Sequence, residues 1–170
     1  MIRRISLTLL FGLLSILIQG TLIKALFPGA VVPGLLLVLV VFLAFFETSV
    51  LGVILAFLLG IEYDMCSGLM IGPWAGAFVV VFGVVASLSQ RIFVESPVAV
   101  MVTVFLSSLF SNFVFLLIVL QVRYTNAVFG WAFFVEALLS AAVCVPLFSL
   151  YRKFLVPVPV GPGRRLGAHA

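Results

Sequence analysis

The sequence predicts an all-α membrane protein, a polytopic bundle of about six transmembrane helices. Of its 170 residues, 65% are hydrophobic and only 8% are charged, whereas a soluble domain carries about 25% charged residues. So many apolar side chains cannot all be buried in one core, and water does not tolerate them on an outer surface. The apolar runs are also continuous, which excludes the alternating strands of a β-barrel. The composition therefore excludes a soluble enzyme, a disordered chain and a nucleic-acid-binding domain.

Charged and turn residues divide the chain into six apolar runs, and a membrane-spanning helix needs about 20 such residues. The expected spans are 5–26, 31–46, 50–66, 74–90, 98–121 and 128–150. The first run follows Arg3 and Arg4, as the apolar region of a signal peptide would. It lacks a small-residue cleavage pattern, however, and five more runs follow it. We therefore expect it to remain as the first span.

The second and third runs are predicted to form a tight helical hairpin. Pro33 is expected in the first turn of the second run, where its missing N–H costs little. Only residues 47–49 separate this run from the third. Because the connection is so short, the two helices have to lie side by side.

The remaining runs end in polar or turn segments. A turn containing glycine and proline precedes the fourth run, and short polar loops follow the fourth and fifth. Arg152 and Lys153 follow the sixth run. Residues 1–156 are thus expected to form a single transmembrane domain. Residues 157–170, rich in proline and glycine, are expected to form a flexible cytoplasmic tail.

Basic residues predict the orientation, because cytoplasmic loops carry an excess of Lys and Arg. With the N-terminus in the cytoplasm, seven basic residues lie inside: Arg3, Arg4, Arg91, Arg152, Lys153, Arg164 and Arg165. Only Lys24 and Arg123 then lie outside. Both termini are therefore predicted to be cytoplasmic, and the net charge of +4 is explained by topology.

No residue pattern indicates metal, cofactor or catalytic chemistry. Cys66 and Cys144 form no CxxC pair, and His169 is the single histidine, whereas a structural zinc site needs about four ligands. A Walker loop, an HExxH motif and a GxSxG motif are also missing from the sequence. We therefore expect no cofactor, no metal and no catalytic residue.

Ionisable groups at membrane depth are costly, so each one is a candidate site. Glu62 and Asp64 are two residues apart, hence about 200° apart on a helix, and cannot form one paired-carboxylate site. Asp64 is also a candidate for a structural role in the turn that follows. Glu136 is expected to face the bundle or its outer boundary, with Lys24 or Arg123 as a partner for Glu136 or Asp64. The residues expected to hydrogen-bond across helices are Gln19, Ser111 and Asn112.

Small residues recur at intervals of four around the connection between the third and fourth runs. They are Gly60, Asp64, Gly68 and Gly72. This spacing lets helix backbones approach closely, and glycines suit the turn between two helices. Either a tightly packed hairpin or a docking surface for another membrane helix explains the pattern.

This segment resembles the marker of the rod-shape-determining protein MreD family, a G-x-x-x-D-x-x-S-G-x-x-x-G-like motif between the third and fourth spans. The residues that carry it are Gly60, Asp64, Ser67, Gly68 and Gly72. Pro33 matches a proline that opens the second span of the family, and Asn112 stands where the fifth span commonly has an acid. Glu62 and Glu136 depart from the family pattern.

The resemblance implies a multi-pass, non-enzymatic scaffold of the cell-elongation machinery in the bacterial cytoplasmic (inner) membrane. Such proteins lie beside MreC, near the MreB cytoskeleton and the peptidoglycan synthases, and help to maintain rod shape. The expected partners are therefore an MreC-like single-span membrane protein, indirectly MreB and the synthases, and the lipid bilayer, with no nucleic acid. The segment from Asp64 to Gly72 is expected to serve the fold and MreC binding.

Two other functions fit the same layout. The first is a substrate-binding subunit of a vitamin importer of the energy-coupling-factor type, which is also a small six-span bundle. The residues on the predicted outer side that would line its pocket are Glu62, Asp64, Trp74, Arg123, Trp131 and Glu136. The second is a membrane enzyme acting on lipids through Asp64 or Glu136, although no paired base or metal motif accompanies either residue.

Overall fold

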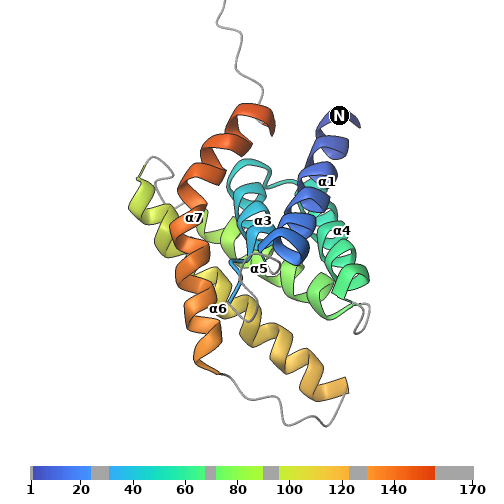
Figure 1. Cartoon of the computed structure of the whole chain (residues 1–170). Coiled ribbons are helices and arrows are strands. Elements are labelled where there is room, and N and C mark those ends of the chain that lie inside the picture. The colour runs from blue at the N-terminus through green and yellow to red at the C-terminus, as the bar shows by residue number, and fades with distance from the viewer. Residues whose placement is uncertain (1, 24–30, 68–71, 90–95, 123–129, 156–170) are drawn as a thin grey trace, which may run out of the picture.

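The computed structural model describes residues 2–23, 31–67, 72–89, 96–122 and 130–155 (Figure 1). Within these ranges the chain forms six α-helices and one π-helical turn, and no strand. The elements are α1 (Ile2–Leu17), η1 (Ile18–Ile23), α3 (Leu35–Phe46), α4 (Val50–Ser67), α5 (Pro73–Ser89), α6 (Pro97–Val122) and α7 (Trp131–Leu155). The all-α class expected from the sequence is confirmed.

Three of the described helices, α4, α6 and α7, are long and apolar enough to cross a membrane, judged by length and composition. The apolar helices α1, α3 and α5 are shorter. Helix α3 has only 12 residues, a length of about 18 Å against about 30 Å of bilayer hydrocarbon. Six membrane crossings therefore stay a prediction.

Helix α3 forms the centre of the bundle. Every side chain from Leu35 to Ala44 is buried, and Val38, Val40 and Ala44 have no exposed surface. The helix contacts α1, α4, α5, α6 and α7. A helix that is apolar on all sides has to be surrounded by protein or lipid, and α3 is surrounded by the other five helices. Its short length is tolerated because those helices shield it from lipid.

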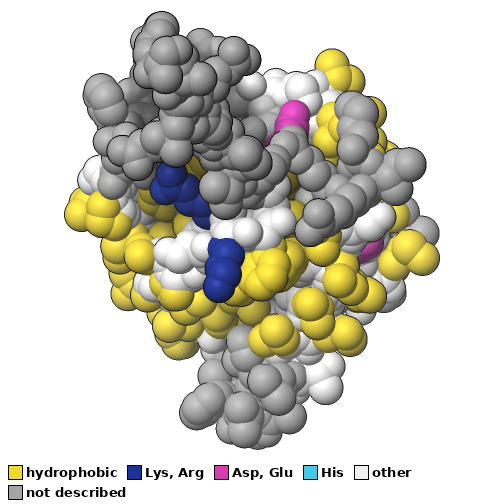
Figure 2. All heavy atoms as spheres, turned by 90° about the horizontal axis from the view of Figure 1, so that it is seen from above, with side chains coloured by type: hydrophobic (Ala, Val, Ile, Leu, Met, Phe, Trp, Pro, Cys, Tyr) yellow, Lys and Arg dark blue, Asp and Glu magenta, His cyan; other side chains and the backbone are white. Residues whose placement is uncertain are grey.

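The outer surface of the bundle is apolar as well, as the yellow side chains of Figure 2 show. Examples from four helices are Leu10, Ile54, Leu106 and Leu138, each more than half exposed. Large contiguous apolar surfaces on a monomer suit lipid and not water. The structure and the composition therefore both indicate an integral membrane protein.

The N-terminal end of α1 and the C-terminal end of α7 lie at the same end of the bundle (Figure 1). Arg152 and Lys153 are exposed in the last turn of α7, and Figure 2 looks down on basic side chains at this end. This arrangement is the one expected if both termini lie on the same side of the membrane. That the side is the cytoplasm stays a prediction.

The start of α3 differs from the prediction. The helix begins at Leu35, so Pro33 lies before it and not in its first turn. The N–H of Gly34 donates to Ser140 Oγ of α7 at 2.8 Å. Gly34 is the N-cap of α3, because its ψ of 72° is not helical while its carbonyl already accepts a helical hydrogen bond from Val38 N–H at 3.1 Å. The N–H of an N-cap has no partner within the helix, and here it ties the start of α3 to α7.

Helix α7 also extends beyond its predicted end at residue 150, and reaches Leu155. Tyr151 is 1% exposed. Its ring packs edge-on against Phe11 of α1 and Phe42 of α3, with centroid distances of 5.6 and 5.5 Å. Aromatic pairs of this kind stabilise packing. Basic residues in the last turn of a helix also interact favourably with its dipole, so α7 continues through Arg152 and Lys153.

Candidate functional site

Asp64 of α4 caps the beginning of α5. The side chain is 2% exposed. Its Oδ2 accepts hydrogen bonds from the N–H groups of Gly72 at 2.8 Å and Ala75 at 3.2 Å, and its Oδ1 accepts one from Trp74 at 3.1 Å. The first N–H groups of a helix have no partner within the helix, and the positive end of the helix dipole favours an anion. The carboxylate therefore ties α5 to α4.

Pro73 fits this arrangement because it opens α5. Proline is favoured at the first position of a helix, since its missing N–H is one of the groups that lacks an intrahelical partner. The three N–H groups bound by Asp64 belong to residues on both sides of Pro73. One carboxylate thus satisfies the donors that remain at this helix end.

Gly60 lets the two helices approach. A Cβ added at Gly60 would lie 2.7 Å from Ala75 N and 2.9 Å from the Trp74 carbonyl oxygen, and real side chains do not come so close to backbone. Gly60 lies one turn before Asp64, and residues four apart share a helix face. We call Gly60, Asp64 and the α5 residues Trp74 and Ala75 the α4–α5 clamp. The four-residue spacing of Gly60 and Asp64 in the motif therefore places both residues on the face of α4 that contacts α5.

Gly72 has a conformational role in the clamp. Its φ is +125°, in the region that glycine adopts freely and other residues rarely do. This conformation directs its N–H to Asp64. No atom lies within 4 Å of a Cβ added there, so the constraint comes from the backbone and not from packing.

Gly72→Ala is expected to destabilise the bundle by about 1–2 kcal/mol through backbone strain alone. The check is the thermal midpoint Tm of the purified protein, compared with Gly20→Ala, because a Cβ at Gly20 also meets no atom within 4 Å and no positive φ is present there. Equal Tm values for the two variants would contradict the proposed role of Gly72.

Glu62 and Asp64 face different neighbours, as their spacing predicts. A Cβ added at Gly12 of α1 would lie 2.8 Å from Glu62 Oε2, so this carboxylate faces α1. Asp64 faces α5. The two acids therefore do not form a paired-carboxylate site.

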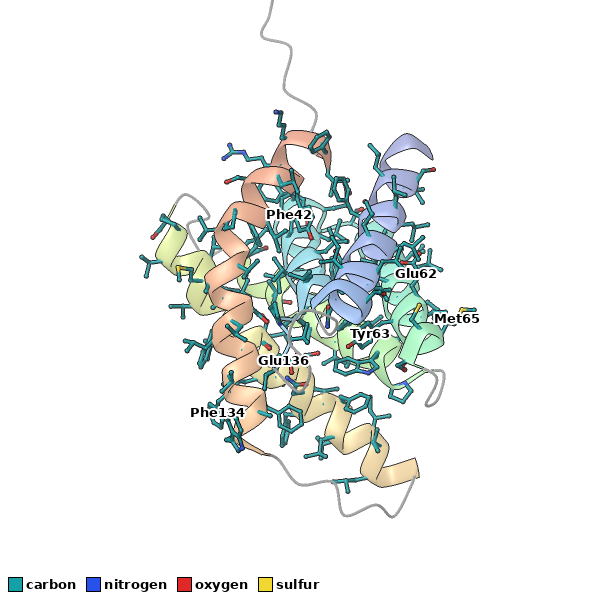
Figure 3. The ribbon with its side chains drawn as sticks, viewed as in Figure 1. Phe42, Glu62, Tyr63, Met65, Phe134 and Glu136 are labelled. Carbon is teal, nitrogen blue, oxygen red and sulfur yellow. The ribbon has the colours of Figure 1, made fainter. Side chains whose placement is uncertain are left out.

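A second group of polar side chains lies inside the bundle, around Glu136 of α7 (Figure 3). Asn112 Nδ2 of α6 donates to Glu136 Oε2 at 3.4 Å, and Gln19 Nε2 of η1 donates to Tyr63 Oη of α4 at 3.4 Å. The cross-helix hydrogen bonds expected for Asn112 and Gln19 are thus present, whereas the one expected for Ser111 is not, because Ser111 Oγ has no partner among the described residues. We call this group, together with Ser108 and Ser111 of α6, the polar centre.

The backbone before α3 borders the polar centre. Ser140, fully buried in α7, accepts a hydrogen bond from the N–H of Gly34 at 2.8 Å and donates to the Glu136 carbonyl at 2.7 Å. A Cβ added at Gly34 would lie 3.4 Å from Glu136 Oε1. Glycine at this position therefore leaves space beside the carboxylate.

A comparison with protein families decides what kind of protein this is. Residues 1–155 match the family model of the rod shape-determining protein MreD. The chain belongs to the MreD family. Membership gives the chain a role in determining rod shape and agrees with its apolar helical bundle. Searches among curated proteins and among solved structures found no match.

The MreD-like motif of this chain is largely structural where the structure describes it. Ser67 Oγ donates to the Asp64 carbonyl at 2.9 Å, within the last turn of α4. Gly68 lies outside the described residues. Lys24 and Arg123, the expected partners of Asp64 or Glu136, lie outside them too. The described partners of Asp64 are backbone N–H groups and not a basic side chain.

Sequence reasoning about this MreD-family chain missed several residues of the two sites. Gly34, Ser108 and Ser140 were not singled out, and neither was Tyr63. The one available signal was Gly34 directly after Pro33, because a Pro-Gly pair marks a turn and not a helix interior. The serines carried no signal, since serine is common in membrane helices.

Proposed function

We propose that this MreD-family chain is a non-enzymatic scaffold of the bacterial cell-elongation complex, and that it binds an MreC-like single-span membrane protein. Family membership supports the shape-determining role. The observation that carries the proposal is the use of the Asp64 carboxylate. Three backbone N–H groups occupy its two oxygens, so this acid serves assembly of the helices and is not available as a general acid or base.

The α4–α5 clamp supports binding of a partner by holding the end of α4 against the start of α5. Met65 is 68% exposed, and Cys66 and Ser67 are exposed beside it. These residues end α4 at the side opposite the predicted cytoplasmic termini (Figure 1). In our proposal the helix or periplasmic stalk of the MreC-like partner binds at this end. MreB and the peptidoglycan synthases are then reached indirectly, through the partner.

The cavity of the polar centre, which is lined by Trp74 and Glu136 of the residues expected to line a vitamin pocket, is too small for a vitamin. It measures about 20 Å³, which is room for about one water molecule. Pockets for small organic ligands usually measure about 300–1,000 Å³. A vitamin does not fit this cavity without rearrangement of the helices around it.

Purification of the tagged chain from its native inner membrane in mild detergent tests the proposal. Mass spectrometry for proteins and small molecules is expected to find an MreC-like single-span protein in near-equal amount. Recovery of an ATPase pair or a bound vitamin, without such a partner, would instead support the importer. Recovery of neither would contradict the scaffold as proposed.

A further inference from the structure

Three buried oxygen atoms of the polar centre have no hydrogen-bond partner in the described part of the chain. They are Gln19 Oε1, Ser108 Oγ and Ser111 Oγ. Their side chains are 9%, 1% and 2% exposed, and all three line the cavity beside Glu136. An amide oxygen only accepts, so a buried and unpaired one costs free energy unless a donor or a cation reaches it.

Glu136 adds a negative charge to the same cavity. An ionised carboxylate inside a membrane bundle needs a proton, a cation or a basic partner. The basic residues whose side chains the structure describes are Arg152 and Lys153. Both lie at the far end of α7, about 24 Å from Glu136 along the helix. Asn112 contributes one long hydrogen bond to the carboxylate, at 3.4 Å.

The backbone around the cavity is irregular. Gln19 belongs to the π-helical turn η1, and Gly34 to the non-helical segment before α3. Irregular backbone at membrane depth is tolerated where it is buried or lines a polar cavity, and π-helical turns are frequent at functional sites. In secondary transporters, Na⁺ sites lie where helices are interrupted in this way.

We propose that the polar centre is a binding site for one small monovalent cation of the size of Na⁺. Glu136 supplies the charge, and Gln19 Oε1, Ser108 Oγ and Ser111 Oγ supply neutral oxygen ligands. Hard cations prefer oxygen ligands, and a single carboxylate suits a charge of one better than the several carboxylates of a Ca²⁺ site. A transition metal is not indicated, because no group of three or more His, Cys, Asp or Glu lies together in the described part of the chain.

Thermal unfolding of the purified full chain tests the site, with NaCl replaced by choline chloride at constant ionic strength. Na⁺ is expected to raise Tm with increasing concentration, by about 5–11 °C at a hundredfold excess over Kd. Glu136→Gln is expected to abolish this rise, and Ser111→Ala to weaken the apparent Na⁺ affinity about tenfold. The matched control is Ser87→Ala, because Ser87 is exposed and donates only to the Gly83 carbonyl of its own helix.

Equal Tm values of the wild-type chain in Na⁺ and in choline would overturn the proposal and leave a proton or a basic residue as the partner of Glu136. A Na⁺ effect that persists at full size in Glu136→Gln would overturn it as well. The wild-type comparison decides the matter even if Glu136→Gln does not fold. The result does not depend on whether the chain binds an MreC-like partner, because the measurement uses only the purified chain.

Discussion

Gly60→Leu is expected to destabilise the bundle by about 3 kcal/mol or more. A Cβ at this position would lie 2.7 Å from Ala75 N and 2.9 Å from the Trp74 carbonyl oxygen. These are backbone atoms that cannot rotate away, so α4 and α5 have to separate. Overpacking of this kind costs about 1–3 kcal/mol and sometimes more. The expected fall in Tm of the purified protein is about 6–12 °C.

Gly83→Leu is the matched control for Gly60→Leu. Gly83 lies in α5, is exposed, and has no atom within 4 Å of an added Cβ. Substitutions of exposed residues usually change stability by less than about 0.5 kcal/mol. If both leucine variants lowered Tm equally, the close approach at Gly60 would not be what stabilises the packing of α4 against α5.

Asp64→Ala is expected to cost about 3 kcal/mol. It removes the acceptor of three N–H groups at the start of α5, in a place where the side chain is 2% exposed and water is scarce. Hydrogen bonds to charged groups contribute about 1.5–3 kcal/mol, and donors left buried without a partner add a penalty. The measurement is again Tm, together with hydrogen exchange of the Trp74 and Ala75 amides, which should become faster.

Asp64→Asn separates the contribution of the charge of Asp64 from that of its hydrogen bonds, and Ser67→Ala is the control. The asparagine keeps one acceptor oxygen and loses the charge, so about half of the loss is expected. Ser67 donates only to the Asp64 carbonyl, and its substitution by alanine should change stability by less than about 0.5 kcal/mol. If Asp64→Ala changed neither Tm nor amide exchange, the cap that Asp64 forms on α5 would not be needed for stability.

The contact between α4 and α5 was the most predictable part of the site. The four-residue spacing of Gly60 and Asp64 predicted a shared helix face, and Gly72 predicted a turn. That Asp64 binds the N–H groups of Trp74 and Ala75 was not predictable, because those donors follow it by 10 and 11 residues. Only the angle between the two helices brings them to the carboxylate.

The burial of α3 and the polar centre were harder to predict. A helix such as Leu35–Phe46 is apolar on all sides both when it faces lipid and when protein surrounds it. The sequence therefore does not reveal that it is central. Gln19, Asn112 and Glu136 were each recognised as polar groups at membrane depth, but they lie on three elements. Their convergence depends on how those elements pack around the start of α3.

The most direct test of the central claim compares the amount of MreC-like protein retained by the wild-type chain, Gly60→Leu and Gly83→Leu in native-membrane purifications. The claim is that the α4–α5 clamp builds the surface to which the partner binds. We expect near-equal amounts of the partner with the wild-type chain and with Gly83→Leu, and a loss of most of it with Gly60→Leu. Full retention of the partner by Gly60→Leu would contradict the claim.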